Sequence, residues 1–211
     1  KYNSSVDQIK FEKNNATGIM SKGVFYDADF IISNSDIKKI YDHLIKSKTF
    51  EVKSPSSSAI IFYWGISKKF KQLDLHNIFF ADDYKSEFDN IFNNKDVAYS
   101  DPTIYINISS KCNSSDAPND SENWFVMINT SWNKGQDWNQ YREKSKKFIL
   151  KKLSAILKED ISKLIVTEQY LDPIKIESNT SSHGGSLYGS SSNSKTSAFF
   201  RHSNFSKYRN L

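Results

Sequence analysis

The feature that most constrains the fold is one near-continuous apolar run, Ala59–Gly65. It has the length of a β-strand and is much shorter than the roughly 20 apolar residues that a membrane-spanning helix needs. Successive side chains of a strand point to opposite faces, so apolar residues at consecutive positions are typical of a strand buried on both sides. The sequence therefore predicts a sheet with Ala59–Ile66 at its centre, and it argues against a membrane-spanning segment.

The remaining segments predict a mixture of strands and helices. Thr103–Ser109 and Trp124–Asn129 alternate apolar and polar residues, which is typical of strands with one buried face. The longest predicted helix, Tyr141–Leu157, is apolar on one side and basic on the other. Further strands are predicted at Ser5–Phe11, Ala16–Met20, Val24–Ser33 and Asn77–Phe80, further helices at Ile37–Ile45 and Tyr84–Phe92, and a strand or helix end at Ile161–Tyr170. Because this order is mixed and has no repeat, we expect an α+β domain on a mixed or antiparallel sheet with flanking helices.

Sequence motifs for catalysis or for metal binding are missing. No Gly-x-Gly-x-x-Gly follows a strand, the four histidines lack metal-ligand spacing, and no catalytic residue can be named. The single cysteine, Cys112, cannot form an internal disulfide, which fits a reducing cytoplasm. Asp82, Asp83 and Glu87 could form a metal or acid/base cluster. Their place directly before a helix favours a capping role instead.

The basic residues indicate a solvated surface rather than a nucleic-acid site. The net charge is +5, and lysines gather at Lys68–Lys71 and along Lys144–Lys152. A phosphate-binding surface would need these charges on one face, beside groups that read bases. We therefore expect no nucleic-acid partner.

Aromatic residues are unusually frequent on the predicted strands. Phe62, Tyr63 and Trp64 are consecutive, and so are Phe79 and Phe80. In a strand such neighbours point to opposite faces, so that one side can pack helices while the other lines a cavity. The pattern leaves two hypotheses open: an aromatic core, or a wide apolar pocket for a long hydrophobic ligand.

Short motifs in a fixed order along nearly the whole chain carry a family resemblance. The most specific stretch is Ser57–Gly65, followed by His76–Tyr84 and Glu87–Phe92. The others are Val6–Ile9, Ala16–Ile19, Ala28–Asp36, Asp101–Tyr105, Asp116–Pro118, Asn123-Trp124, Trp138 with Tyr141-Arg142, Glu168 with Asp172-Pro173, Gly185–Gly189, Phe200-Arg201 and Asn210-Leu211. Taken together, the ordered set resembles the bacterial-type phytoene desaturase family, which are FAD-dependent carotenoid desaturases.

The resemblance implies the organisation of the chain. Residues 1–35 would be a remnant of the FAD-binding domain, residues 36–185 the substrate-binding domain, and residues 186–211 a return toward the FAD domain. A dinucleotide fingerprint is expected before Lys1 and a Gly-rich, flavin-contacting segment after Leu211. In this family FAD accepts a hydride from a C–C bond of a polyene, so the 211 residues alone are expected to be inactive.

The resemblance also implies site residues. The FAD contacts would be Val6, Asn34, Tyr188, Gly189 and Arg201, and the polyene channel would be lined by Tyr63, Trp64, Phe79, Phe80 and Trp124. One departure weakens the role of Arg201: the family usually has Arg-Pro near the final Asn-Leu, where this chain has Phe200-Arg201-His202-Ser203.

The resemblance further implies a bacterial, cytoplasmic protein that contacts a membrane peripherally, since its polyene substrates dissolve there. The basic helix Tyr141–Leu157 and the aromatic rim are candidate docking surfaces. Desaturation of a phytoene-like or hydroxylated carotenoid precursor is the expected function. A carotene isomerase or a retinol-saturase-like enzyme of the same fold, or a non-catalytic polyene- or lipid-binding module, are the alternatives.

Overall fold

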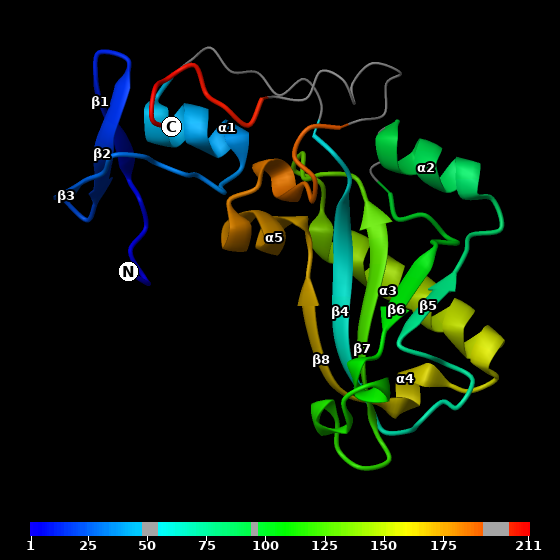
Figure 1. The fold of residues 1–211 in the computed structure, drawn as a ribbon. Helices are drawn as coiled ribbons and strands as arrows, with labels where there is room; N and C mark the ends of the chain where they lie inside the picture. The colour runs from blue at the N-terminus through cyan, green and yellow to red at the C-terminus, as the bar shows by residue number, and fades with distance from the viewer. Residues whose placement is uncertain (48–54, 94–96, 192–202) are drawn as a thin grey trace.

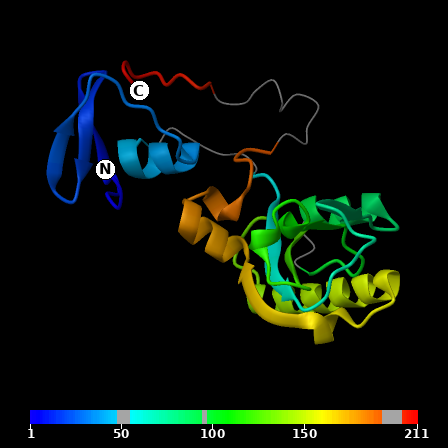
Figure 2. The ribbon, with the colours of Figure 1, turned by 60° about the horizontal axis from the view of Figure 1, so that its bottom comes forward.

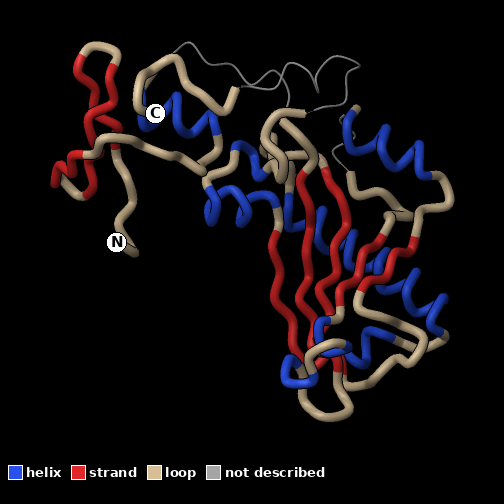
Figure 3. Tube along the Cα trace, viewed as in Figure 1, coloured by secondary structure: helices blue, strands red, loops and turns tan. Residues whose placement is uncertain are grey.

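Two antiparallel sheets organise the part of the chain that the computed structural model describes, residues 1–47, 55–93, 97–191 and 203–211 (Figures 1 and 3). The smaller sheet contains, in order, β1 (Gln8–Glu12), β2 (Asn15–Ser21) and β3 (Val24–Asp27). The larger sheet has the order β5 (His76–Phe79), β6 (Ile104–Asn107), β7 (Glu122–Thr130), β4 (Ser58–Ile66) and β8 (Ile165–Leu171). Every neighbouring pair in it is antiparallel, which confirms the predicted α+β fold.

The strand β4 lies inside the larger sheet, as its apolar run predicts. It pairs with β7 on one side and with β8 on the other. Its residues Ala59, Ile60 and Phe62 are buried. The main chain of an inner strand is hydrogen-bonded on both sides. Its side chains alternate between the two faces of the sheet, and the residues on each face decide what that face contacts.

Helix α3 (Trp138–Leu157) covers one face of the larger sheet (Figures 1 and 2). It begins at its N-cap Asp137, whose carboxylate accepts a hydrogen bond from the main-chain N–H of Gln140. Ile149 and Leu153 of the helix are fully buried in the core that the even-numbered residues of β4 and β7 form. Burial of each such side chain stabilises the fold by about 1.5–3 kcal/mol. The helix therefore fixes which face of the sheet becomes core.

The other helices are short, and three begin at an aspartate that accepts a main-chain hydrogen bond. They are α1 (Ile37–Lys39) with the π-helix η1 (Ile40–Ile45), α2 (Tyr84–Phe92), α4 (Ile161–Leu164), α5 (Pro173–Thr180), and the 3₁₀ turns η2 (Ser109–Lys111), η3 (Ser114–Asp116) and η4 (His183–Gly185). The capping residues are Asp36 for α1, Asp83 for α2 and Asp172 for α5. Among the described residues, none of the helices is both long enough and apolar enough to cross a bilayer.

The predicted strand through Ala28–Ile32 is wrong, because β3 ends at Asp27. The Ala28 N–H still donates to the carbonyl of Thr17 in β2, at 3.1 Å, but further along the Ile31 N–H donates to the carbonyl of Asn210, at 2.8 Å. The side chain of Ile32 is 96% exposed. An apolar run makes a strand only where a partner strand continues beside it, and β2 pairs with β3 only as far as Asp27.

Residues 203–211 pack beside the smaller sheet (Figure 1). Arg209 forms a parallel bridge with Asn15, and its carbonyl accepts from the Ala16 N–H at 3.0 Å. Leu44 of η1 joins Ile9 and Ala16 in a second small core. The segment 36–45 therefore packs with the smaller sheet. The division at residues 35 and 185 stays a prediction.

Candidate functional site

The face of the larger sheet that α3 does not cover, called here the open face, carries two rows of side chains. The strand register places Gln169, Tyr63, Phe125, Asn107 and His76 in the first row, and Leu171, Ile61, Met127, Tyr105 and Ile78 in the second. Each row crosses all five strands, which corresponds to roughly 19 Å at the usual strand spacing. The open face is therefore long and narrow, and most of it is apolar.

Aromatic rings in contact form the middle of the open face. The rings of Tyr63 and Phe125 meet edge to face with their centroids 5.5 Å apart, and the ring of Tyr105 approaches Phe125 in the same way at 6.1 Å. Tyr63 remains 42% exposed. Phe125 and Tyr105 are partly exposed, so the three rings together present an apolar surface larger than a single exposed side chain.

A cavity of about 540 Å³ adjoins these rings, above β7, β4 and β8. The segment Asp116–Pro118 forms one of its walls, and Thr167 and Gln169 add polar groups. Gly65 also borders the cavity, where a Cβ atom would come within 2.5 Å of the Thr167 Oγ1. The size and the mixture of an apolar surface with a few polar groups are typical of a small-molecule site.

The two tryptophans predicted for the channel are core residues. Trp64 and Trp124 border the cavity, yet they are only 2% and 1% exposed and belong to the core beneath α3. Their indole N–H groups donate to Glu168 at 2.7 Å and to Glu122 at 2.8 Å. This placement argues against a direct substrate contact, because the indoles fill the covered side of the sheet and are already hydrogen-bonded.

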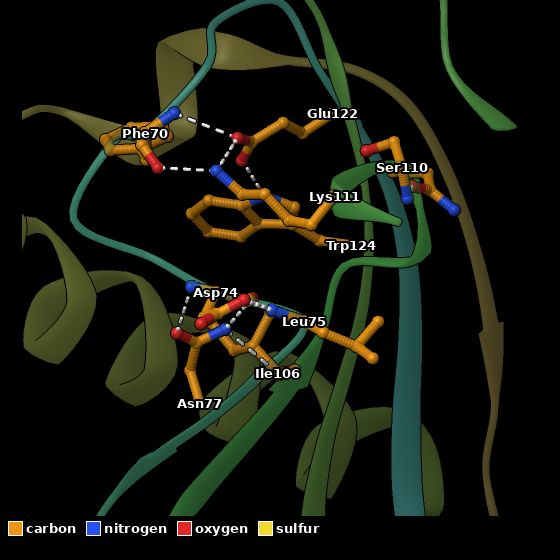
Figure 4. Close-up of polar contacts among 10 residues, drawn as sticks. Phe70, Asp74, Leu75, Asn77, Ile106, Ser110, Lys111, Glu122 and Trp124 are labelled. Atoms are coloured by element: carbon orange, nitrogen blue, oxygen red, sulfur yellow. Dashed lines mark hydrogen bonds and ion pairs between the residues drawn. The ribbon is translucent and has the colours of Figure 1, made fainter. Parts of the chain in front are cut away.

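Glu122 is buried but fully paired (Figure 4). Its Oε1 accepts from the Phe70 N–H at 2.9 Å and lies 2.7 Å from the Lys111 ammonium, while Oε2 accepts from Trp124. The ammonium also donates to the carbonyl of Phe70, at 2.6 Å. A buried carboxylate whose two oxygens are both held by donors of the protein has a structural role, and this group ties the segment around Phe70 to the start of β7.

The other two predicted channel residues also lie away from the open face. Phe79 pairs with Ile104 and packs partly buried against the core beneath α3. Phe80 is exposed just beyond β5, where its ring lies 6.3 Å from that of Tyr84. Only Tyr63 of the five predicted residues is in the open-face rows. Sequence reasoning missed Phe125, whose position one residue after Trp124 puts it on the opposite face.

The predicted cofactor residues are spread over two parts of the chain. Val6 is half-buried beside the small core, and Asn34 is exposed. Tyr188 is exposed, and Gly189 has a positive φ of 68° with open space where a Cβ would lie. Arg201 lies outside the described residues. The described residues show no contact among these candidates, and their role stays a prediction.

The carboxylates at the start of α2 have structural roles. Asp83 accepts from the Ser86 N–H at 3.0 Å and from its hydroxyl at 2.6 Å, and the hydroxyl hydrogen bond lowers the pKa of Asp83. Glu87 accepts from the Thr103 N–H at 2.8 Å and from its hydroxyl at 2.6 Å. The capping interpretation is confirmed for Asp83, whereas Glu87 holds the residue that precedes β6. Within the described ranges, no three His, Cys, Asp or Glu residues are grouped to hold a metal ion.

The site thus combines an antiparallel sheet that has one helix-covered face with a second, apolar and aromatic face beside a cavity. No family model matches the chain. Over 98% of its length, however, it is 47% identical to a 1-hydroxycarotenoid 3,4-desaturase of Flavobacterium sp. (strain P99-3), covering 43% of that protein. It is 30% identical to a 4,4'-diaponeurosporene oxygenase of Staphylococcus aureus (96% of the chain, 42% of the relative) and 29% identical to a phytoene desaturase of Fusarium fujikuroi (98% and 40%).

Over nearly its whole length the chain is therefore similar to carotenoid desaturases, which confirms the resemblance in the sequence motifs. It spans about two fifths of the length of the curated relatives it matches. Among solved structures, an oxidoreductase from Methanosarcina mazei is similar with a TM-score of 0.46 and 12% identity, over 79% of this chain and 36% of that one. That likeness is too low to support an argument about function.

Proposed function

We propose that the whole protein is an FAD-dependent oxidoreductase that introduces a double bond into a carotenoid precursor, and that this chain supplies its polyene-binding face. The observation that carries the proposal is the open face: the rings of Tyr63, Phe125 and Tyr105 are in contact there, and Tyr63 and Phe125 line a cavity of about 540 Å³. It occurs in a chain 47% identical to a protein named for desaturation of a hydroxycarotenoid. A flat, polarizable polyene can pack along such rings over its whole length.

FAD would supply the hydride acceptor for this reaction. Tyr188 and Gly189 fit a contact with a flat cofactor, because the Tyr188 ring is exposed and open space adjoins the Gly189 backbone. Their main chain is held in place: the Ser56 hydroxyl accepts from the Tyr188 N–H at 2.9 Å, and the Gly189 carbonyl accepts from the Ser56 N–H at 2.8 Å. Val6 and Asn34 remain candidate contacts on the smaller sheet and the segment after it.

Peripheral contact with a membrane is part of the proposal. Lys144, Lys147 and Lys151 follow one another at helical spacing on the exposed side of α3. They have no carboxylate partner in the described part of the chain, whereas Lys146 and Lys152 pair with Glu168 and Asp101. Unpaired cations in a row favour an anionic lipid surface, at roughly 1 kcal/mol for each lysine close to it.

The experiment is to purify the whole protein and incubate it with a hydroxylated carotenoid precursor in detergent. We expect a yellow protein with a flavin absorption spectrum, and a product that is lighter than the substrate by two hydrogen atoms. A colourless protein, or no loss of hydrogen from any polyene, would contradict the proposal.

A second candidate function is oxygenation of a polyene, favoured by the 30% identity to a diaponeurosporene oxygenase. The mass of the product separates the candidates. Desaturation removes two hydrogens, oxygenation adds oxygen, a carotene isomerase leaves the mass unchanged, and a retinol-saturase-like reaction adds two hydrogens. A non-catalytic binding module would return the polyene unchanged in both mass and geometry.

A further inference from the structure

A polar cluster lies at one edge of the open face, where β5 and β6 pair. The Nδ1 atom of His76 lies 2.8 Å from the Tyr105 hydroxyl and 3.3 Å from the Asn107 amide nitrogen. The imidazole and the phenol ring also stack, with their centroids 6.1 Å apart. The same Asn107 nitrogen donates to the carbonyl of Leu75 at 3.2 Å, which fixes its orientation.

These contacts favour one arrangement of the hydrogens, in which the Tyr105 O–H and the more distant Asn107 N–H share the Nδ1 lone pair of His76. The Asn107 amide nitrogen can only donate, so the Nδ1 atom of the neutral His76 ring is an acceptor. The Tyr105 O–H then donates to Nδ1, and the ring hydrogen is on Nε2. The phenol oxygen of Tyr105 keeps its acceptor capacity, and no donor reaches it from the described residues. A hydroxyl that donates one hydrogen bond becomes a better acceptor for the next.

The position of the cluster matches a ligand with a long apolar body and one hydroxyl. The Tyr105 ring continues through Phe125 to Tyr63, so an apolar body on this row would bring one end of the ligand close to the phenol oxygen. Aromatic rings alone stabilise a polyene equally well with or without a hydroxyl. Strong discrimination of a hydroxyl requires a hydrogen-bond partner built into the site.

We infer that Tyr105, positioned by His76 and Asn107, binds the hydroxyl group of the carotenoid. The substrate O–H donates to the Tyr105 oxygen, and Tyr105 donates in turn to the Nδ1 atom of His76. This inference rests on the proposed function, in which the substrate is a hydroxycarotenoid. It makes Tyr105 a specificity-determining residue and His76 a positioning residue.

The test compares two Tyr-to-Phe variants of the whole protein. Tyr105→Phe removes the phenol oxygen but keeps the ring packed on Phe125, and Tyr63→Phe removes the equivalent oxygen from the ring on the other side of Phe125. Dissociation constants from quenching of tryptophan fluorescence, and kcat/KM values, are measured in detergent. The two probes are a polyene with a hydroxyl at carbon 1 and the same polyene without it.

We expect the wild-type protein to prefer the hydroxylated polyene. Tyr105→Phe should reduce that preference by roughly 2- to 12-fold, the factor that corresponds to one hydrogen bond. Tyr63→Phe should change both polyenes alike and leave the preference intact. A preference that survives in Tyr105→Phe, or falls equally in Tyr63→Phe, would overturn the inference.

The proposed function and this inference fail in different ways. A wild-type protein that desaturates both polyenes without preference would overturn the hydroxyl site and leave the desaturase function standing. A wild-type protein that binds neither polyene would overturn both.

Discussion

Glu122 offers the sharpest test of the core, because Glu168 repeats two of its contacts, those with a tryptophan and a lysine. Each carboxylate accepts from a tryptophan indole, Trp124 or Trp64, and pairs with a lysine. They differ in burial: the side chain of Glu122 is 2% exposed and that of Glu168 is 29% exposed. Glu122 also accepts from the Phe70 N–H, so the comparison measures what burial and this additional main-chain donor add to the tryptophan and lysine contacts that both sites share.

The perturbation is Glu122→Gln. Three donors, from Phe70, Lys111 and Trp124, point at the carboxylate. The glutamine amide has one oxygen, which can accept two of these hydrogen bonds. Its NH₂ group then faces the remaining donor and cannot accept from it. One charge-assisted bond, worth about 1.5–3 kcal/mol, is lost together with the attraction to the lysine. Lys111 keeps its hydrogen bond to the Phe70 carbonyl, so the total loss is below that of a completely orphaned buried charge. We expect a loss of about 2–4 kcal/mol.

Amide hydrogen exchange on the whole protein, read by mass spectrometry, measures this loss locally. The effect should be concentrated in the segment around Phe70 and in β7. Glu168→Gln, the matched control, should cost less than about 1 kcal/mol because solvent compensates an exposed pair. Equal losses at Glu122 and Glu168, or no loss at Glu122, would refute the reasoning.

Three further predictions concern the fold and the cavity. Leu153→Ala should destabilise the protein by about 2–5 kcal/mol in urea unfolding, because it leaves a cavity beneath α3. Burial is the largest single influence and opposes ionisation of Asp101, but the hydrogen bonds from Lys152 and from the Asp82 N–H, together with the lysine charge, outweigh it and lower the pKa. The contribution of ionised Asp101 to stability is therefore complete above its unfolded pKa of about 3.9, and it is lost as the pH falls through its pKa in the folded protein. Asp101→Asn should consequently reduce the loss of stability that the protein shows at acid pH in a stability–pH curve. Gly65→Ala should weaken polyene binding, measured by fluorescence quenching, because the added Cβ meets Thr167 Oγ1, and Thr167→Ala should restore it.

Local sequence signals were sufficient for most elements. The predicted helix Tyr84–Phe92 has the bounds of α2, because Asp83 offers a clear cap and the apolar spacing is helical. The strand at Ala59–Ile66 differs from β4 by one residue. Ala28–Ile32 failed for a non-local reason: its main-chain partner is Asn210, far away in the sequence.

The candidate site could be predicted only in part. Alternation along a strand shows that Tyr63 and Trp64 point to opposite faces, but it does not show which face α3 covers. The partner of the Trp64 indole, Glu168, is 104 residues away, so no local pattern reveals that this ring is satisfied in the core. The contact of the Tyr63, Phe125 and Tyr105 rings depends on the register of three strands, which the sequence does not fix.

The central claim is that the open face holds the polyene, and a structure of the whole protein with a bound carotenoid tests it most directly. The account predicts the polyene chain in van der Waals contact with the rings of Tyr63 and Phe125, with its hydroxyl end at Tyr105. Trp64 and Trp124 should remain behind the sheet, hydrogen-bonded to their glutamates. A polyene bound elsewhere, with the open face covered by another part of the protein, would contradict the account.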